Sequence, residues 1–489
     1  MKPVNSNKHI VYTNKNSTIK RILTKRGYAI IKKHYNLKEL TEIKSDLMVK
    51  PYVNEEYGAS PDPYPIYLES EKKIYIPKHI GFEKFGQPDK IKLTKGIEID
   101  VEFKGNLRDK QTPIIQSFMK SCEEGSMKEK SQGGIISVPC GWGKTIMALY
   151  LIGKLKRKTI IIVHKEFLLN QWIKRIEEFL PEARVGIIQA SKVDYKNKDI
   201  VIGMLQTIVS RDYTPDDFLS FGTVIFDECH HLGARVFSQC FNKLISKKMI
   251  GLTATVNRKD GLTKVFKYFI GDIMYSMKKK LNTHDVKIEG IHYYSNSEMH
   301  KELFNRRGDL NFPGMLNNIV KIPERNNFIV SKIKNYISEG RKIILLSHRI
   351  NHLKLLKLMI EKENISSVGL YIGGMKMVTL EQSKKADVLL GTYNMVSEGF
   401  DDPIRNTLIL STPLSDVVQS AGRILRKQHE LQPIILDIID EFSVFPKQWK
   451  KRSTYYKKEK WKFDETEILD GEIINKEFEE QEPITECVL

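Results

Sequence analysis

The pattern of hydrophobic and polar positions changes along the chain near residue 105. Beyond it, short apolar runs typical of buried strands recur, and the first series is GGIISV, KTIIIVH, DIVIGML, GTVIFDE and KMIGLTAT. Amphipathic stretches with a helical period separate them, such as KTIMALYLIGKLK and EFLLNQWIKRIEEFL. Strands that alternate with helices predict an α/β fold in which helices cover both faces of a parallel sheet.

The same alternation restarts in the second half of the chain and predicts a second parallel sheet. Its strand candidates are RKIILLSH, ADVLLGTY, NTLILST and QPIILDIID, and NHLKLLKLMIEKE and SDVVQSAGRILRK are the helices between them. The first hundred residues differ, because DPYPIYLESEKKIYIPKHIGFEKFG alternates aromatic and β-branched residues with turn formers. That pattern predicts a small β-containing module.

These patterns divide the chain into five parts. We expect an N-terminal accessory module over residues 1–100, a first lobe over 101–280, a linker over 281–324, a second lobe over 325–445 and a basic-then-acidic tail over 446–489. A chain of 489 residues is also too long for a single hydrophobic core.

The charge of the chain is large and uneven. Residues 464–489 hold ten acids and one lysine and so carry −9, which leaves +28 on the rest of a chain whose formal charge is +19. A basic surface of that size favours a polyanion as partner, most simply nucleic acid. The alternative is an ordinary solvated surface in a lysine-rich protein.

Two features bear on the compartment. No run of 18 apolar residues occurs, so the sequence predicts no membrane span and no membrane partner. The five cysteines are scattered without a CxxC pair, which favours a reducing compartment inside the cell, either cytoplasm or nucleus.

VPCGWGKT, residues 138–145, follows an apolar run and precedes a helix, the strand–loop–helix context of a phosphate-binding loop. Lys144 is expected to reach the terminal phosphates of ATP, and Thr145 to ligate Mg²⁺. Val138 stands where the usual motif has its first glycine, at a strand end where a side chain fits the core. The residues expected around the nucleotide are Pro139, Cys140, Gly141, Trp142, Gly143, Lys144 and Thr145.

The apolar run TVIF leads directly into the acids of TVIFDECHH. Asp227 and Glu228 therefore lie at the C-terminal end of a predicted strand, where ligands gather in open parallel sheets. We expect Asp227 to hold Mg²⁺ and Glu228 to orient or deprotonate the attacking water.

DECH, GWGKT and LTAT together resemble the motifs of the superfamily-2 helicases of DExH type, and the resemblance extends over about 320 residues. It implies two tandem RecA-like lobes, with Arg108 and Gln111 of LRDKQTPIIQSF at the adenine edge. It also assigns first-lobe residues to nucleic-acid contact or to coupling of hydrolysis with movement: His164, Lys165, Gln206, Thr207, Thr253 and Thr255.

The resemblance continues in LLSHR, GTYNMVSEGFDDP and QSAGRILR. Gln419, Arg423 and Arg426 share one helical face, and the family implies that the two arginines act as fingers on nucleotide held by the first lobe. Gly399 and Asp401 are expected at the nucleotide. Ser347, Arg349 and Thr392 are expected at the nucleic acid or in coupling.

Within the family, the motifs are closest to the transcription and repair helicases, which include the TFIIH helicase subunit and the poxvirus transcript-release helicase. The N-terminal module has the position and size of the small DNA-engaging domain of several members. The expected function is an ATPase that translocates on or unwinds DNA from 3′ to 5′, with RNA polymerase or other transcription and repair factors as partners. The alternatives are an RNA helicase and a non-unwinding, ATP-driven clamp.

The bias toward Lys, Ile and Asn suits an AT-rich genome such as that of a large DNA virus, whose virion is a further candidate location. The acidic tail from Asp464 has few apolar residues and is expected to form no core. Tethered to a basic body, it is expected to compete with nucleic acid. The alternatives are a solubility tail and a docking strip for another protein.

Overall fold

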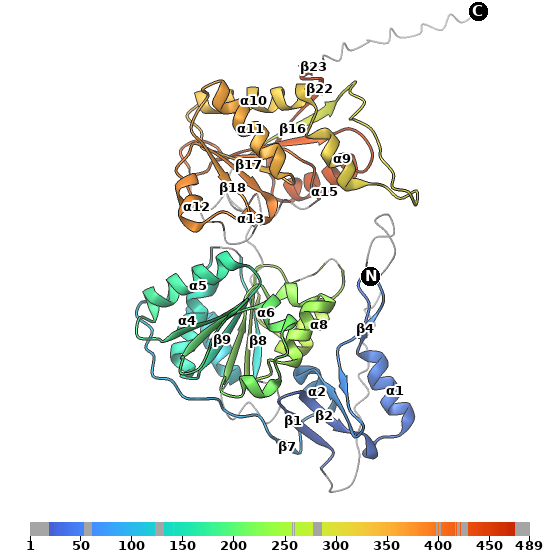
Figure 1. Ribbon diagram of the computed structural model, residues 1–489, viewed down its shortest axis with the longest axis vertical. Helices are drawn as coiled ribbons and strands as arrows, with labels where there is room; N and C mark the ends of the chain where they lie inside the picture. The colour runs from blue at the N-terminus through green and yellow to red at the C-terminus, as the bar shows by residue number, and fades with distance from the viewer. Residues whose placement is uncertain are drawn as a thin grey trace, which may run out of the picture. The chain divides into compact units, whose positions relative to one another are not determined.

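The computed structural model describes residues 19–52, 61–122, 132–139, 141–256, 258, 260–276, 286–397, 400, 402–415, 417, 421 and 429–474. The chain divides into two compact units, residues 1–279 and 280–489 (Figure 1). Each unit contains an eight-stranded, mostly parallel sheet. The fold is α/β, with two tandem RecA-like lobes and a small N-terminal sheet.

The sheet of lobe 1 has the strand order β11-β10-β12-β9-β13-β14-β8-β15. Every neighbouring pair is parallel except β10 with β11. The strands are β8 (Gly133–Ser137), β9 (Thr159–Val163), β10 (Val185–Gln189), β11 (Lys192–Asp194), β12 (Ile200–Met204), β13 (Thr223–Phe226), β14 (Lys248–Thr253) and β15 (Ile273–Ser276).

Alternation along these strands builds a separate core on each face of the sheet. In β9, Ile160 and Ile162 join one core, and Ile161 and Val163 join the other. The second core is closed by α3 (Thr112–Cys122), α4 (Lys144–Leu155) and α5 (Glu166–Phe179). The first core is closed by α6 (Leu205–Ser210), α7 (Arg235–Ser238) and α8 (Thr263–Ile270).

The N-terminal module is packed onto lobe 1. Its sheet has the order β5-β6-β2-β1-β7, and its apolar residues join the first core of lobe 1. The buried Lys78 ammonium donates to the carbonyls of Gln132 (2.8 Å), Ser246 (3.2 Å) and Lys247 (2.9 Å), which fixes the module to the lobe. Its elements are β1 (Arg21–Thr24), β2 (Gly27–Ile31), α1 (Leu37–Asp46), β3 (Met48–Val49), β4 (Tyr64–Pro65), β5 (Leu68–Glu69), β6 (Lys73–Ile76), α2 (Lys78–Phe85) and β7 (Lys90–Ile91).

Lobe 2 is the second unit, and its sheet has the order β18-β19-β17-β20-β21-β16-β22-β23. Only β22 with β23 is antiparallel. The strands are β16 (Lys287–Tyr294), β17 (Ile343–Ser347), β18 (Val368–Tyr371), β19 (Val388–Thr392), β20 (Thr407–Leu410), β21 (Ile434–Asp440), β22 (Lys462–Leu469) and β23 (Glu472–Ile473). The helices are α9 (Phe312–Ile319), α10 (Pro323–Ser338), α11 (Ile350–Lys362), α12 (Met377–Ser383), α13 (Tyr393–Ser397) and α15 (Phe445–Lys458).

Two segments differ from the division expected from the sequence. The expected linker 281–324 contains β16, which pairs with β21 on one side and β22 on the other. The expected tail 446–489 contains most of α15 as well as β22 and β23. The sequence predicts a tail from Asp464 onward because β22 has no strong apolar run. Only Ile468 of this strand is fully buried. Within the described residues, no helix is long and apolar enough to cross a membrane.

Candidate active site

Three loops of lobe 1 meet at one edge of its sheet. Strands β13, β14 and β8 are adjacent and parallel, and Thr253 at the end of β14 lies opposite Ser137 at the end of β8. The loop after β8, the DECH segment after β13 and the segment after β14 therefore emerge side by side. This is the edge at which parallel sheets bind ligands.

The loop after β8 turns into α4 through two glycines in the left-handed region. Gly141 has φ +82° and Gly143 has φ +79°, and α4 begins directly at Lys144. The positive φ of Gly143 disfavours any other residue there, and a Cβ atom would also displace the Gln111 side chain, whose Nε2 would lie 2.5 Å away. Cys140 lies outside the described residues. A helix start with a permissive loop before it offers backbone N–H groups to an anion.

Gln111, which the sequence assigns to the adenine edge, is bonded to this loop. Its Nε2 donates to the carbonyl of Trp142 at 2.8 Å, and its Oε1 accepts from the backbone N–H of Arg108 at 2.9 Å. Trp142 is half-buried, and the ammonium of Lys110 lies 5.9 Å from the centroid of its ring. The Arg108–Gln111 segment thus supports the loop from outside the sheet.

A chain of polar contacts links the loop to the two strands beside it. Lys144 Nζ lies 3.2 Å from Glu228 Oε1, and Glu228 Oε2 lies 3.4 Å from His230 Nδ1. His230 Nδ1 is in turn 2.9 Å from the hydroxyl of Thr253 at the end of β14. The same hydroxyl donates to the carbonyl of Thr255 at 2.7 Å.

Glu228 has the backbone conformation that non-glycine residues avoid. Its φ is 46° and its ψ is 52°, between β13 and the 3-10 turn Cys229–Gly233. Such a conformation costs on the order of 1–3 kcal/mol and persists where the surroundings impose it, often at functional sites. The turn aims the carboxylate at Lys144 and His230.

Asp227 is held by a residue that is not among those expected at the site from the sequence. Trp172 of α5 is 1% exposed, and its Nε1–H donates to Asp227 Oδ2 at 2.9 Å. Burial of the carboxylate, together with the neighbouring charge of Glu228, raises the pKa of Asp227 to about 6, while the Trp172 hydrogen bond and Lys144 oppose the rise. The sequence signal for Trp172 is only its helical spacing among apolar residues, which is typical of a core position.

The other lobe 1 residues assigned to nucleic acid or coupling lie on the same edge. Gln206 Nε2 donates to the carbonyl of His164 at 2.8 Å, and Lys165 directly precedes α5. The hydroxyl of Thr207 accepts the backbone N–H of Ala190 at 3.0 Å. Contacts between segments thus bring together the loops after β9 and β12.

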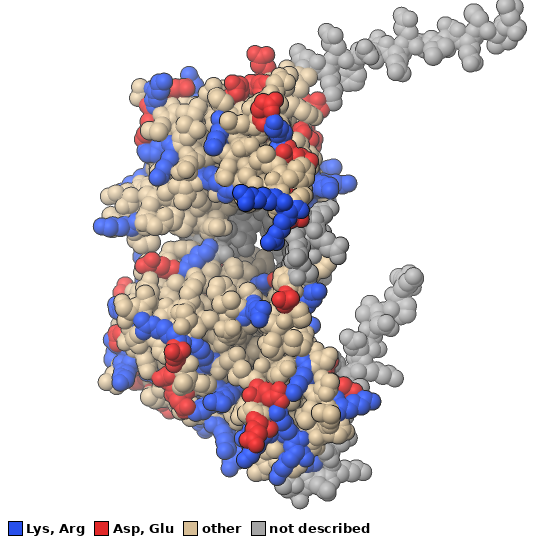
Figure 2. Space-filling view, turned by 45° about the vertical axis from the view of Figure 1, so that its right-hand side comes forward, with Lys and Arg blue, Asp and Glu red and all other residues tan. Residues whose placement is uncertain are grey.

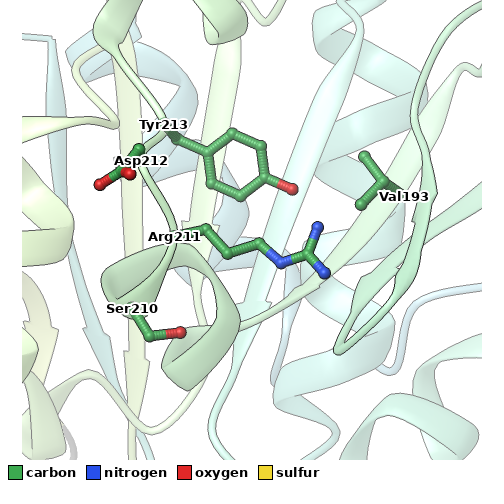
Figure 3. A pocket seen from close by; sticks show the side chains of 5 residues that line it. All are labelled: Val193, Ser210, Arg211, Asp212 and Tyr213. Carbon is green, nitrogen blue, oxygen red and sulfur yellow. The ribbon is translucent and has the colours of Figure 1, made fainter.

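A shallow hollow of about 530 Å³ lies at the far end of α6 (Figure 3). Its lining residues are Val193, Ser210, Arg211, Asp212 and Tyr213. In Figure 3 the Arg211 and Tyr213 side chains point toward Val193, and Asp212 turns the other way. None of the residues expected to act on ATP lines it.

In lobe 2, the hydroxyl of Ser347 is buried and already bonded. It lies 3.0 Å from His352 Nδ1 and accepts the backbone N–H of Arg349 at 3.1 Å. Burial lowers the pKa of His352 to about 3, so the ring is neutral. The Ser347 side chain is therefore used inside the lobe, at the start of α11, and its hydroxyl is not presented to a ligand.

The remaining lobe 2 residues are only partly described. Arg349 Nε donates to Asn317 Oδ1 at 2.6 Å, and its Nη2 donates to the carbonyl of Pro313 at 3.0 Å. Thr392 ends β19 and is half-buried. The other expected residues lie outside the described part of the chain: Gly399, Asp401, Gln419, Arg423 and Arg426.

Comparisons with known proteins show what the chain is similar to. Residues 104–258 match the family model described as "Type III restriction enzyme, res subunit". The chain is 36% identical over 468 residues to "Putative ATP-dependent RNA helicase L396" of Acanthamoeba polyphaga mimivirus, which covers 93% of this chain and 88% of that protein. It is 30% identical over 381 residues to "Putative helicase 161L" of Invertebrate iridescent virus 6, with 74% and 83% covered. A solved structure, "S. cerevisiae Dbp5 bound to RNA and ADP BeF3", is 12% identical with a TM-score of 0.47 and covers 72% of this chain and 93% of that one.

Proposed function

Because the chain belongs to the superfamily-2 helicases and is an ATPase of that family, we propose that it is a motor that translocates on or unwinds DNA from 3′ to 5′. The observation that carries the proposal is the contact chain from Lys144 through Glu228 and His230 to Thr253. It joins the phosphate-binding loop to the segment after β14. A change at the nucleotide therefore has a physical route to the rest of lobe 1.

The contacts of Lys144 suggest how ATP would act on this chain. Its ammonium now lies against the Glu228 carboxylate. The terminal phosphates of ATP carry more negative charge than one carboxylate and would compete for the same ammonium. Glu228 would then be released to orient the attacking water, and its contact with His230 would transmit the change.

The residues of the site also fit Mg²⁺. The half-buried Asp227 carboxylate, a second carboxylate beside it and the Thr145 hydroxyl at the start of α4 are hard oxygen donors, which this ion prefers. We assign Asp227 and Thr145 to holding it. When bound, the ion would neutralise charge that develops on the phosphates.

We assign Arg423 and Arg426 to stabilising the transition state, with Gln419 beside them and Gly399 and Asp401 at the nucleotide. Two guanidinium groups supplied by lobe 2 would make hydrolysis depend on the state of both lobes. This would convert ATP turnover into movement.

DNA is our preferred substrate because the motifs resemble those of the transcription and repair helicases. The charge of +28 outside residues 464–489 suits nucleic acid of either kind. Figure 2 shows Lys and Arg side chains on both units, with smaller groups of Asp and Glu between them. A second candidate, an RNA helicase, is favoured by the name of the relative at 36% identity. RNA polymerase or other transcription and repair factors are the proposed protein partners.

The deciding experiment measures ATP turnover by the full chain with no polymer, single-stranded DNA, duplex DNA, forked DNA and RNA. We expect stimulation by the single-stranded and forked DNA, and displacement of a strand annealed on the 5′ side of a 3′ overhang. Stimulation by RNA alone would overturn the preference for DNA. Stimulation by DNA without strand displacement or movement would favour the ATP-driven clamp.

A further inference from the structure

Helix α15 carries a dense basic face that the motor motifs do not use. Its buried side is formed by Phe445, Gln448, Trp449, Arg452, Ser453 and Tyr456. The opposite side exposes Lys447, Lys450, Lys451, Lys457 and Lys458. Lys450 and Lys451 follow Lys447 by three and four residues, and Lys457 and Lys458 follow them by seven, so the lysines form one stripe along the helix.

The stripe is uniform in sign and chemistry. The only acid between residues 445 and 462 is Glu459, which is 8% exposed. Within the described residues, Lys450, Lys451, Lys457 and Lys458 form no ion pair with a carboxylate. No large apolar residue of α15 is exposed, so the face does not suit an apolar protein partner.

The helix is rigidly anchored beneath its lysines. Arg452 donates to both oxygens of Asp437 at 2.8 Å each, with both side chains 1% exposed. The hydroxyl of Tyr456 donates to Asp437 Oδ2 at 2.9 Å, and its ring stacks on Trp461 at 5.7 Å between centroids. Only the long lysine side chains need to be ordered when a ligand binds, which lowers the entropic cost.

The dimensions suit a nucleic-acid backbone. From Lys447 to Lys458 the helix rises about 16 Å, at about 1.5 Å per residue. One strand of duplex DNA carries a phosphate about every 3.4 Å along the axis, so the stripe matches about five phosphates. Lysines act as flexible point charges and suit contacts that do not depend on base sequence.

We propose that the exposed face of α15 is an additional docking surface for a nucleic-acid phosphate backbone, separate from the motif residues of either lobe. This inference rests on the proposed function, since it assigns a second contact to the same polymer. Arg452 also bonds the carbonyl of Leu414, in the segment that precedes the expected arginine fingers. Backbone bound on α15 would therefore lie on the same helix that holds Leu414 in place.

The test replaces Lys450, Lys451, Lys457 and Lys458 with Gln. The matched control replaces four exposed lysines elsewhere in lobe 2, namely Lys321, Lys334, Lys354 and Lys362, and so removes the same charge. Binding of labelled single-stranded and duplex DNA is titrated at four salt concentrations. Polymer-free ATP turnover checks that each variant is intact.

We expect the α15 variant to bind more weakly at low salt, with the slope of log K against log salt reduced by about three, at about 0.7–0.9 per lost contact. The control should change the slope by less than one. Equal slopes in the two variants would overturn the proposal. If the unmodified chain neither binds nor responds to any polymer, the proposed function itself fails.

Discussion

The indole of Trp172 donates to Asp227 Oδ2 at 2.9 Å, which joins the buried face of α5 to the first acid of the DECH segment. The other oxygen, Oδ1, accepts the backbone N–H of Glu228 at 3.1 Å. Both oxygens are therefore oriented by donors, and the direction of the remaining lone pairs is fixed before any ligand arrives. Trp172 is in this sense a positioning residue.

Replacing Trp172 with Phe keeps most of the packing volume but removes the N–H donor. A hydrogen bond to a charged group contributes about 1.5–3 kcal/mol, so we expect ATP turnover to fall roughly tenfold or more. The magnesium concentration for half-maximal ADP binding, measured by calorimetry, should rise. ADP binding without metal should be unchanged.

Trp461→Phe is the control for that variant. Trp461 is 4% exposed, and its N–H has no acceptor within the described part of the chain. Equal losses in the two variants would mean that Trp172 contributes only packing.

Substitutions at the two residues of the Lys144–Glu228 ion pair should have different effects on ATP binding and turnover. Lys144→Ala removes the charge assigned to the phosphates and should abolish turnover, while circular dichroism should stay unchanged because the two apolar cores of lobe 1 remain intact. Glu228→Gln should still bind ATP and should trap a nucleic-acid-bound state. If Lys144→Ala hydrolysed ATP at the normal rate, the loop would not be the phosphate site.

Arg423→Ala should retain ATP binding and lose stimulated turnover, because a finger contributes only when charge develops in the transition state. A fall of about 10³ is typical of such residues. Single-turnover hydrolysis with saturating DNA measures it directly. Unchanged turnover would assign Arg423 no role in catalysis.

Asp227→Asn should stabilise the nucleotide-free protein while abolishing its activity. The folded-state pKa of Asp227 is raised from 3.8 to about 6, so the folded chain holds a proton more tightly than the unfolded chain does. The resulting penalty is absent below pH 4, grows as pH rises to 6 and is complete above it. Thermal melts should show equal stability near pH 4. At pH 7.5 the free energy of unfolding of the variant should be larger by on the order of 1 kcal/mol.

The acidic end of the chain needs a milder test than deletion from Asp464, because that deletion removes most of β22. We expect neutralisation of the final five acids, Glu477, Glu479, Glu480, Glu482 and Glu486, to tighten DNA binding at low salt. The difference should shrink as salt screens both partners. Identical affinities at low salt would favour a solubility or protein-docking role instead.

Much of the fold follows from local sequence signals. Buried parallel strands need nearly continuous apolar runs, and VIF of β13 or IIIV of β9 is readable without any neighbour. β16 and β22 cannot be recognised in this way, because both contain many polar residues. They are stabilised by pairing with each other, and they lie too far apart in the sequence for a local pattern to show it. Local patterns therefore predicted the two lobes but mistook the first and last strands of lobe 2 for a linker and a tail.

The candidate site likewise contains residues that local sequence predicts and contacts that it does not. Residues that act through the backbone geometry of a short motif, such as Gly143 and Lys144, are predictable from spacing. The partner of a polar atom is not: Trp172 has the spacing of a core residue, and Ser347 lies in a motif yet turns its hydroxyl inward. Only the packing of α5 and α11 against their sheets determines those contacts.

The position of β16 has a consequence for synthesis on the ribosome. It is the first strand of lobe 2 to be made, yet its two neighbours, β21 and β22, are the last long strands of the chain. One edge must wait for about 140 further residues and the other for about 170, a long interval in which an unpaired strand is open to wrong partners. The sheet of lobe 1 contains no strand from the C-terminal part of the chain, so this lobe can fold while lobe 2 is still being synthesised. A premature stop before β22 would thus yield a finished ATP-binding lobe attached to an aggregation-prone remnant.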